Sequence, residues 1–213
     1  MTGRAPARSA LEELHAVITA EGGLLAESLH PRQANRTLPE VFGPLLATGE
    51  RTRRDPHEYS LLVESILEGY LLHHGAGRIV EQPDPDLRLL AGDYLYAFGL
   101  ARLASIGDLD AVEELADLIS LCAQAHADSQ REGRAAAPWQ LTGALWALTV
   151  LAIATGPWPE QQHTKRQSRG DDSTAEQVLD AASRRASSLG VVSELERALI
   201  AFHHAVERSS STK

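Results

Sequence analysis

The sequence predicts an all-α protein, a single-domain antiparallel bundle of about eight helices. Apolar residues recur at three- and four-residue steps along almost the whole chain, which is typical of helices with one buried face. Residues that cap helices precede these stripes, and glycine or proline follows them. No segment alternates apolar and polar residues, and no Asn-Gly or Asp-Gly pair indicates a β-hairpin.

Start and stop signals place the individual helices. Ser9 and Glu12 have the spacing of a capping box, in which each side chain binds the other residue's backbone N–H. Asp55 precedes Pro56, and proline favours the first helical position because no N–H is needed there. Typical stops are Gly75, Gly107, Gly156 and Gly190. We expect helices near 9–29, 37–48, 56–74, 86–106, 109–132, 138–155, 173–189 and 191–208.

The stretch 135–159 contains no charged residue. A membrane-spanning helix needs about 20 predominantly apolar residues. The strongly apolar part here, 141–154, is shorter and is interrupted by Thr142, Gly143 and Thr149. We therefore expect a buried central helix.

The segment 157–172 is rich in polar residues and has almost nothing to bury. The sequence predicts a flexible linker there, within one domain that spans residues 1–213.

Composition excludes several classes of function. The chain has 20 Lys and Arg against 29 Asp and Glu, a net charge of −9, which argues against nucleic acid as a partner. The single cysteine, Cys122, excludes an intrachain disulfide framework and a Cys-rich zinc site. The basic residues near the N-terminus are not followed by an apolar run, so we expect no signal peptide and a cytoplasmic protein.

Candidate metal ligands are present but poorly arranged. His73 and His74 are adjacent, and neighbouring side chains on a helix point about 100° apart, so they do not converge on one ion. Metal-binding helices use spacings of three or four residues, which are also common on solvated faces. Two pairs have that spacing: Glu64 with Glu68, and His203 with Glu207. We expect no metal site and no catalytic residue in this chain.

The run LLAGDYLYAF at 89–98 resembles the LAGDYL segment of the all-α trans-isoprenyl diphosphate synthases. Within that superfamily it is most similar to the small, non-catalytic component of heterodimeric hexaprenyl and heptaprenyl diphosphate synthases. The likeness continues through 103–121 as a helix, a Gly107-Asp108 break and another helix. Weaker parallels cover 33–39, 64–75, 141–145 and 174–208. The resemblance implies a truncated isoprenoid-synthase-like fold.

The departures from that family concern its metal sites. Family enzymes hold Mg²⁺ with two aspartate-rich motifs, and the ions stabilise the departing diphosphate. At the first DDxxD position this sequence has HGAGR (74–78), and the segment 157–172 replaces the region of the second. Asn35 and Leu141 stand where the family has diphosphate-contacting lysines, and only Arg36 remains of those contacts. We therefore expect no prenyl transfer and no bound cofactor for this chain alone, with Mg²⁺ in a catalytic partner.

The resemblance implies a catalytically silent small subunit of a heteromeric polyprenyl diphosphate synthase in isoprenoid quinone side-chain synthesis. Its partner is expected to be a larger, DDxxD-bearing subunit in a heterodimer or heterotetramer, whose interface and product channel this chain helps to shape. One alternative is a homodimeric isoprenoid- or lipid-binding or scaffolding protein without a catalytic partner. Another is unrelated chemistry in a re-used cavity, involving His73, His74 or Glu68.

Two sets of candidate site residues follow from the resemblance. The candidates for contact with an isoprenoid diphosphate are Arg36, His73, His74 and Arg78. The candidates for the interface or channel are Asp93, Tyr94, Tyr96 and Phe98. Each candidate also has a purely structural interpretation. The arginines are then surface charges, the aromatic residues belong to the core, and Asp93 is a solvated or capping carboxylate.

Overall fold

The computed structural model describes residues 9–30, 39–82, 84–131, 138–169 and 174–210. This part of the chain is all-helical, as the sequence predicts, and fits a single helical domain. It contains ten helices and no strand, although one isolated bridge joins Leu29 to Val80. The helices are α1 (Ala10–Glu21), α2 (Gly23–Glu27), α3 (Gly43–Leu46), α4 (Pro56–His74), α5 (Pro85–Ser105), α6 (Leu109–Arg131), α7 (Trp139–Thr155), α8 (Pro159–Arg169), α9 (Ala175–Leu189) and α10 (Val192–Ser210).

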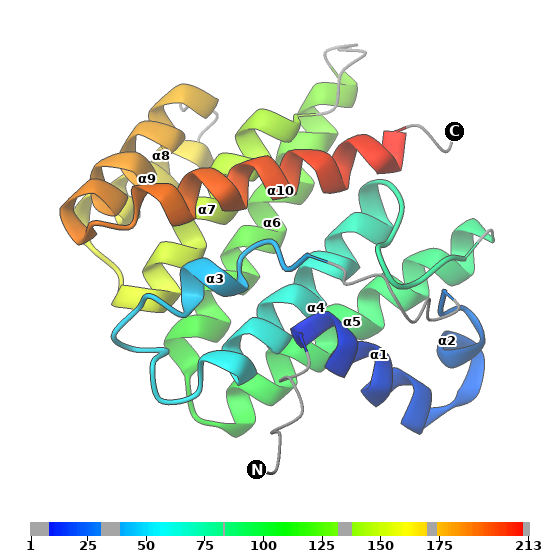
Figure 1. Cartoon of the computed structure of the whole chain (residues 1–213). Coiled ribbons are helices and arrows are strands. Elements are labelled where there is room, and N and C mark those ends of the chain that lie inside the picture. The colour runs from blue at the N-terminus through cyan, green and yellow to red at the C-terminus, as the bar shows by residue number, and fades with distance from the viewer. Residues whose placement is uncertain (1–8, 31–38, 83, 132–137, 170–173, 211–213) are drawn as a thin grey trace, which may run out of the picture.

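The two most buried helices, α4 and α7, organise the bundle. Helix α4 packs against α5, α1, α3 and α10, whereas α7 packs against α9, α6, α10 and α3. Figure 1 shows α10, in red, crossing over α7 and α6. The predicted central helix is therefore buried in the core, and no helix in the described ranges is long and apolar enough to cross a membrane.

Aromatic rings join α4 to α7 in the main core. Phe42 stacks on Trp146 with ring centroids 5.4 Å apart and planes at 9°. Tyr70 of α4 meets the edge of Trp146 at 5.9 Å and stacks on Phe202 of α10 at 6.1 Å. A smaller apolar cluster joins α1, α4 and α5. These four aromatic side chains thus gather where α3, α4, α7 and α10 meet.

Helices α4 and α5 lie close together because glycine occupies their crossing. A Cβ atom on Gly69 would lie 2.8 Å from the carbonyl oxygen of Gly92 and 2.9 Å from the Tyr96 ring. A Cβ atom on Gly99 would lie 2.6 Å from the Ile66 side chain. These contacts fix which face of α5 turns toward α4 and which face turns outward.

Two of the predicted helices differ from the structure in their bounds. The helix expected at 9–29 is divided because Gly22 and Gly23 both have φ of +74°, a left-handed conformation that ends α1. Of the helix expected at 37–48, only Gly43–Leu46 is helical within the described residues. Helix α6 begins at Leu109 with the Asp108 carboxylate accepting the Ala111 N–H.

The prediction of a structureless linker at 157–172 is wrong for most of its length, because α8 occupies Pro159–Arg169. Residues 170–172 lie outside the described ranges. The helix docks through polar groups: the Lys165 ammonium lies 2.5 Å from the Glu114 carboxylate of α6, and Gln161 donates to the same carboxylate at 2.8 Å. Arg169 pairs with Asp117. Apolar periodicity does not reveal a helix that is held by ion pairs.

The glycine crossing leads to a stability prediction. We expect Gly69→Ala to lower the free energy of unfolding by about 1–3 kcal/mol, because the added methyl overpacks against the Gly92 carbonyl. This loss occurs although alanine favours a helix over glycine by about 1 kcal/mol. Urea denaturation followed by circular dichroism measures the change. Ala97→Ser, which adds one heavy atom on the exposed side of α5, is the control and should be near neutral. Equal stability of the two variants would contradict the close approach of α4 and α5 at Gly69.

Candidate functional site

The resemblance places a metal motif at the C-terminal end of α4. Two carboxylates lie in the middle of this helix, one turn apart, on Glu64 and Glu68, and both are completely buried. Glu64 Oε1 accepts three backbone N–H groups of the segment before and at the start of α3. The donors are Val41, Phe42 and Gly43, at 2.7, 2.7 and 3.3 Å. The Glu64 carboxylate thus fixes this segment to α4.

Glu68 does the same for the segment after α4. Its Oε1 accepts the N–H groups of Arg78, Ile79 and Val80 at 2.6, 2.8 and 3.2 Å. Gly77 is required beside it, since a Cβ atom there would lie 2.5 Å from the same oxygen. Each buried acid therefore satisfies three N–H groups that would otherwise be left without partners.

The Arg78 guanidinium bridges the two acids. Its Nη1 donates to Glu64 Oε2, its Nε donates to Glu68 Oε2 at 3.0 Å, and its Nη2 donates to the Glu64 carbonyl oxygen at 2.9 Å. Burial disfavours the charge, but the two carboxylates outweigh it and hold the pKa of Arg78 above its ordinary value. We call Glu64, Glu68 and Arg78 the buried ionic cluster. A diphosphate could reach Arg78 only by displacing both acids.

The two adjacent histidines lie in different environments. His74 stacks flat on His126 of α6, with centroids 3.7 Å apart and planes at 6°. The Tyr70 hydroxyl lies 3.0 Å from His126 Nε2, and Trp139 meets the His126 ring edge-on at 5.1 Å. Burial, with smaller contributions from His126 and His73, lowers the pKa of His74 to about 3. Burial lowers the pKa of His126 to about 4. Both rings are neutral at pH 7 and offer no positive charge to an anion.

His73 turns instead toward α5. Its ring stacks on Tyr96 with centroids 5.1 Å apart and planes at 6°. Its Nε2 lies 3.1 Å from Asp93 Oδ1, within ion-pair distance but out of line for a hydrogen bond. The structure therefore brings one of the predicted substrate contacts, His73, together with two of the predicted interface residues.

The four predicted interface residues divide between packing and exposure. Tyr96 and Phe98 are partly buried, and Phe98 packs against both apolar clusters. Asp93 and Tyr94 are exposed. The Tyr94 hydroxyl donates to Glu21 of α1, and burial together with that carboxylate raises the pKa of Tyr94 to about 12. The LAGDYL-like segment thus contributes to the core on one side and to the surface on the other.

The exposed sides of α5 and α6, two helices that pack against each other, carry small and apolar side chains beside acidic ones such as Asp93 and Glu113. We call this surface the α5–α6 outer face. Its exposed members are Leu90, Tyr94, Ala97, Ala101 and Ala104 on α5, Ile106 between the helices, and Leu109, Ala116, Ser120, Ala123 and Ala127 on α6.

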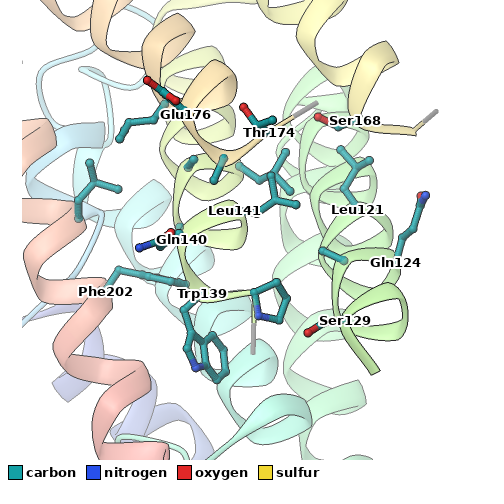
Figure 2. Close-up of a pocket in the computed structure, with 18 of the residues that line it drawn as sticks. Leu121, Gln124, Ser129, Trp139, Gln140, Leu141, Ser168, Thr174, Glu176 and Phe202 are labelled. Atoms are coloured by element: carbon teal, nitrogen blue, oxygen red, sulfur yellow. The ribbon is translucent and has the colours of Figure 1, made fainter. Parts of the chain in front are cut away.

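A pocket of about 1090 Å³ lies elsewhere, between α6, α7, α9 and α10. Figure 2 shows Leu141 of α7 between Phe202 of α10 and Leu121 of α6, with Glu176 and Thr174 of α9 above. Leu141 stands where the resemblance puts a lysine, and it forms part of the apolar lining. Arg36 and Asn35 lie outside the described residues. None of the described candidate site residues lines this pocket.

Sequence reasoning missed the partners of Arg78 and the role of His126. The first had a signal: Glu64 and Glu68 stand one turn apart in an otherwise apolar run, LLVESILEGYLL, and buried acids require partners. The second had a weaker one, because His126 lies four residues after Cys122 on the buried stripe of its helix. Within the described ranges, no three His, Cys, Asp or Glu side chains are placed to hold a metal ion.

No model of a known protein family, no curated protein and no solved structure matches the chain.

The buried ionic cluster predicts a large cost for removing its cation. Arg78→Met should lower the free energy of unfolding by about 3–5 kcal/mol, because it leaves two buried carboxylates facing each other. Arg102→Met is the matched control: its partner is Glu58, the arginine side chain is 41% exposed, and we expect a loss of about 1 kcal/mol or less. Urea unfolding measures both. Similar losses for the two variants would contradict the structural importance of the cluster.

The stacked histidines predict acid sensitivity. Their pKa values lie below the ordinary value of 6.5, so the unfolded chain binds more protons and stability falls as the pH drops below about 6.5. Allowing for partial solvent access, we expect His126 to account for about 1 kcal/mol between pH 6.5 and 4.5, or about 2–4 °C in Tm. His126→Gln should flatten the profile by that amount. His203→Gln, at an exposed histidine, should leave it unchanged, and the opposite ranking would refute the assignment.

Proposed function

We propose that this chain is a catalytically silent subunit of a heteromeric polyprenyl diphosphate synthase. The observation that carries the proposal is the position of the LAGDYL-like segment on α5. Ala91, Gly92 and Leu95 are buried, whereas Leu90 and Tyr94 on the other side of the same segment are exposed. The part of the sequence with the most specific resemblance thus anchors α5 and also presents a surface.

The end of α4 supports a structural role for this scaffold. The residues HGAGR, at the position of the first DDxxD motif, are used internally. His74 stacks on His126, and Arg78 is bound by Glu64 and Glu68. These carboxylates already accept N–H groups and a guanidinium. A partner subunit with its own aspartate-rich motifs supplies the Mg²⁺ chemistry in this proposal.

The α5–α6 outer face is the proposed contact with that partner. Exposed apolar side chains that gather on one surface are typical of protein interfaces. Alanine and serine side chains also let a partner helix come close, since interaxial distance depends on side-chain size. In this proposal, the large apolar contacts on this surface are Leu90, Tyr94, Ile106 and Leu109.

One observation favours the second candidate function, a ligand-binding protein without a catalytic partner. The pocket between α6, α7, α9 and α10 is large and mostly apolar, and neither α5 nor the buried ionic cluster contributes to its described lining. The two candidates therefore make predictions about different surfaces and can be tested separately.

The test of the subunit proposal is capture followed by reconstitution. The tagged chain should retain a DDxxD-bearing synthase from native extract. Together the two should elongate farnesyl diphosphate with isopentenyl diphosphate and Mg²⁺, whereas this chain alone stays inert. Ala101→Arg should reduce retention at least tenfold, because the long charged side chain stands on the α5–α6 outer face.

Ala47→Arg is the matched control, since Ala47 is also exposed but lies at the end of α3. It should retain the partner like the native chain. Capture of no synthase, or elongation by the chain alone, would refute the subunit proposal.

A further inference from the structure

The pocket between α6, α7, α9 and α10 has a continuous apolar lining. Pro138 and the residues 139–141 and 143–145 of α7 supply one wall, and at 1.5 Å per residue this wall is about 10 Å long. Gly143 lies within it, and a Cβ atom there would stand 3.1 Å from the Phe202 ring, so this ring rests close to the α7 backbone. The apolar lining residues are Leu121, Trp139, Leu141, Leu145, Leu179, Leu199 and Phe202.

The polar part of the lining has a distinct charge character. Among the described lining residues, Asp128 and Glu176 carry negative charge, His203 is the other titratable group, and none is Lys or Arg. Asp128 pairs with Arg131, whereas Glu176 stands in the first turn of α9. Gln124, Gln140 and Thr174 add hydrogen-bonding groups. The carboxylates of such a lining accept hydrogen bonds, and Glu176 places negative charge at its edge.

We propose that this pocket binds a chain-like amphiphile whose head group donates hydrogen bonds and carries no negative charge. The apolar lining takes the chain, and the carboxylates and amide side chains take the head group. The volume of about 1090 Å³ is slightly above the range, about 300–1000 Å³, that is usual for drug-sized ligands. This inference does not depend on the subunit proposal.

Three probes with the same ten-carbon chain test the head-group rule. The full-length chain is titrated by calorimetry at pH 7.5 with 1-decanol, decylammonium and decanoate, each below its aggregation threshold. We expect 1-decanol and decylammonium to bind with one molecule per chain, and decanoate to bind at least tenfold more weakly. No binding by any probe, equal binding by all three, or tightest binding by decanoate would overturn the proposal.

Two substitutions in the lining test the location. The double variant Leu141→Gln, Leu179→Gln replaces apolar contacts on α7 and α9 and should weaken 1-decanol binding at least tenfold. The control double variant is Leu109→Gln, Leu189→Gln. These leucines are exposed but do not line the pocket, and Leu189 is 39% exposed against 37% for Leu179 on the same helix. An equal loss in both double variants would place the ligand elsewhere and refute the proposal.

A substitution that removes one charge tests the preference for an uncharged or cationic head group. It changes neither the apolar lining nor the core. Glu176→Gln should raise decanoate affinity about three- to tenfold and leave 1-decanol within twofold, because it removes one negative charge from the exposed edge of the lining. Glu196→Gln, at an exposed position of α10 outside the lining, should change neither. If Glu176→Gln left the ratio of the decanoate and 1-decanol affinities unchanged, the proposal would be contradicted. Light scattering that shows 1-decanol displacing a second copy of the chain from this groove would contradict it too.

Discussion

The fold depends on two carboxylates that are buried in the middle of α4. Glu64 and Glu68 each hold three backbone N–H groups, so the segments before and after this helix are fixed to it at 41–43 and 78–80. Two such charges in an apolar helix are unfavourable unless a cation compensates them, and Arg78 is that cation. Because α4 is fixed on both sides, the glycine crossing with α5 has a defined register, and the α5–α6 outer face has a defined direction.

The end of α4, the exposed side of α5 and the pocket differ in the charge and polarity of their side chains. The end of α4 uses its charges internally, and the imidazoles beside it are neutral because burial lowers their pKa values. The exposed side of α5 offers small apolar contacts, with Tyr94 held by Glu21. The pocket on α6, α7, α9 and α10 combines apolar walls with acidic groups. The described part of the chain thus has an exposed apolar surface and a cavity, but no cluster of cations for a diphosphate at the site that the resemblance indicates.

Local patterns in the sequence predict much of the fold and less of the site. The capping box at Ser9, the limits of α4 and the burial of α7 follow from spacing and composition alone, and the structure confirms them. Local patterns do not predict the break at Gly22-Gly23, which depends on the left-handed backbone conformation of these two residues. They do not predict helix α8 either, because this helix is held by its contacts with α6. Lys165 docks on Glu114, 51 residues earlier, and no local pattern reports such a distance. The same is true of the site: His73 meets Asp93, and Glu64 meets Arg78, only once the helices are packed.

The docking of α8 has a thermal consequence. Its contacts with α6 are ion pairs and hydrogen bonds, with Lys165 almost fully enclosed. The hydration of charged groups becomes less favourable on heating, so the cost of desolvating such pairs declines as temperature rises. Apolar association behaves differently and weakens on cooling. The two kinds of contact therefore respond to temperature in opposite senses: heating lowers the cost of the ion pairs that attach α8, whereas cooling weakens the packing of the leucine- and alanine-rich interior.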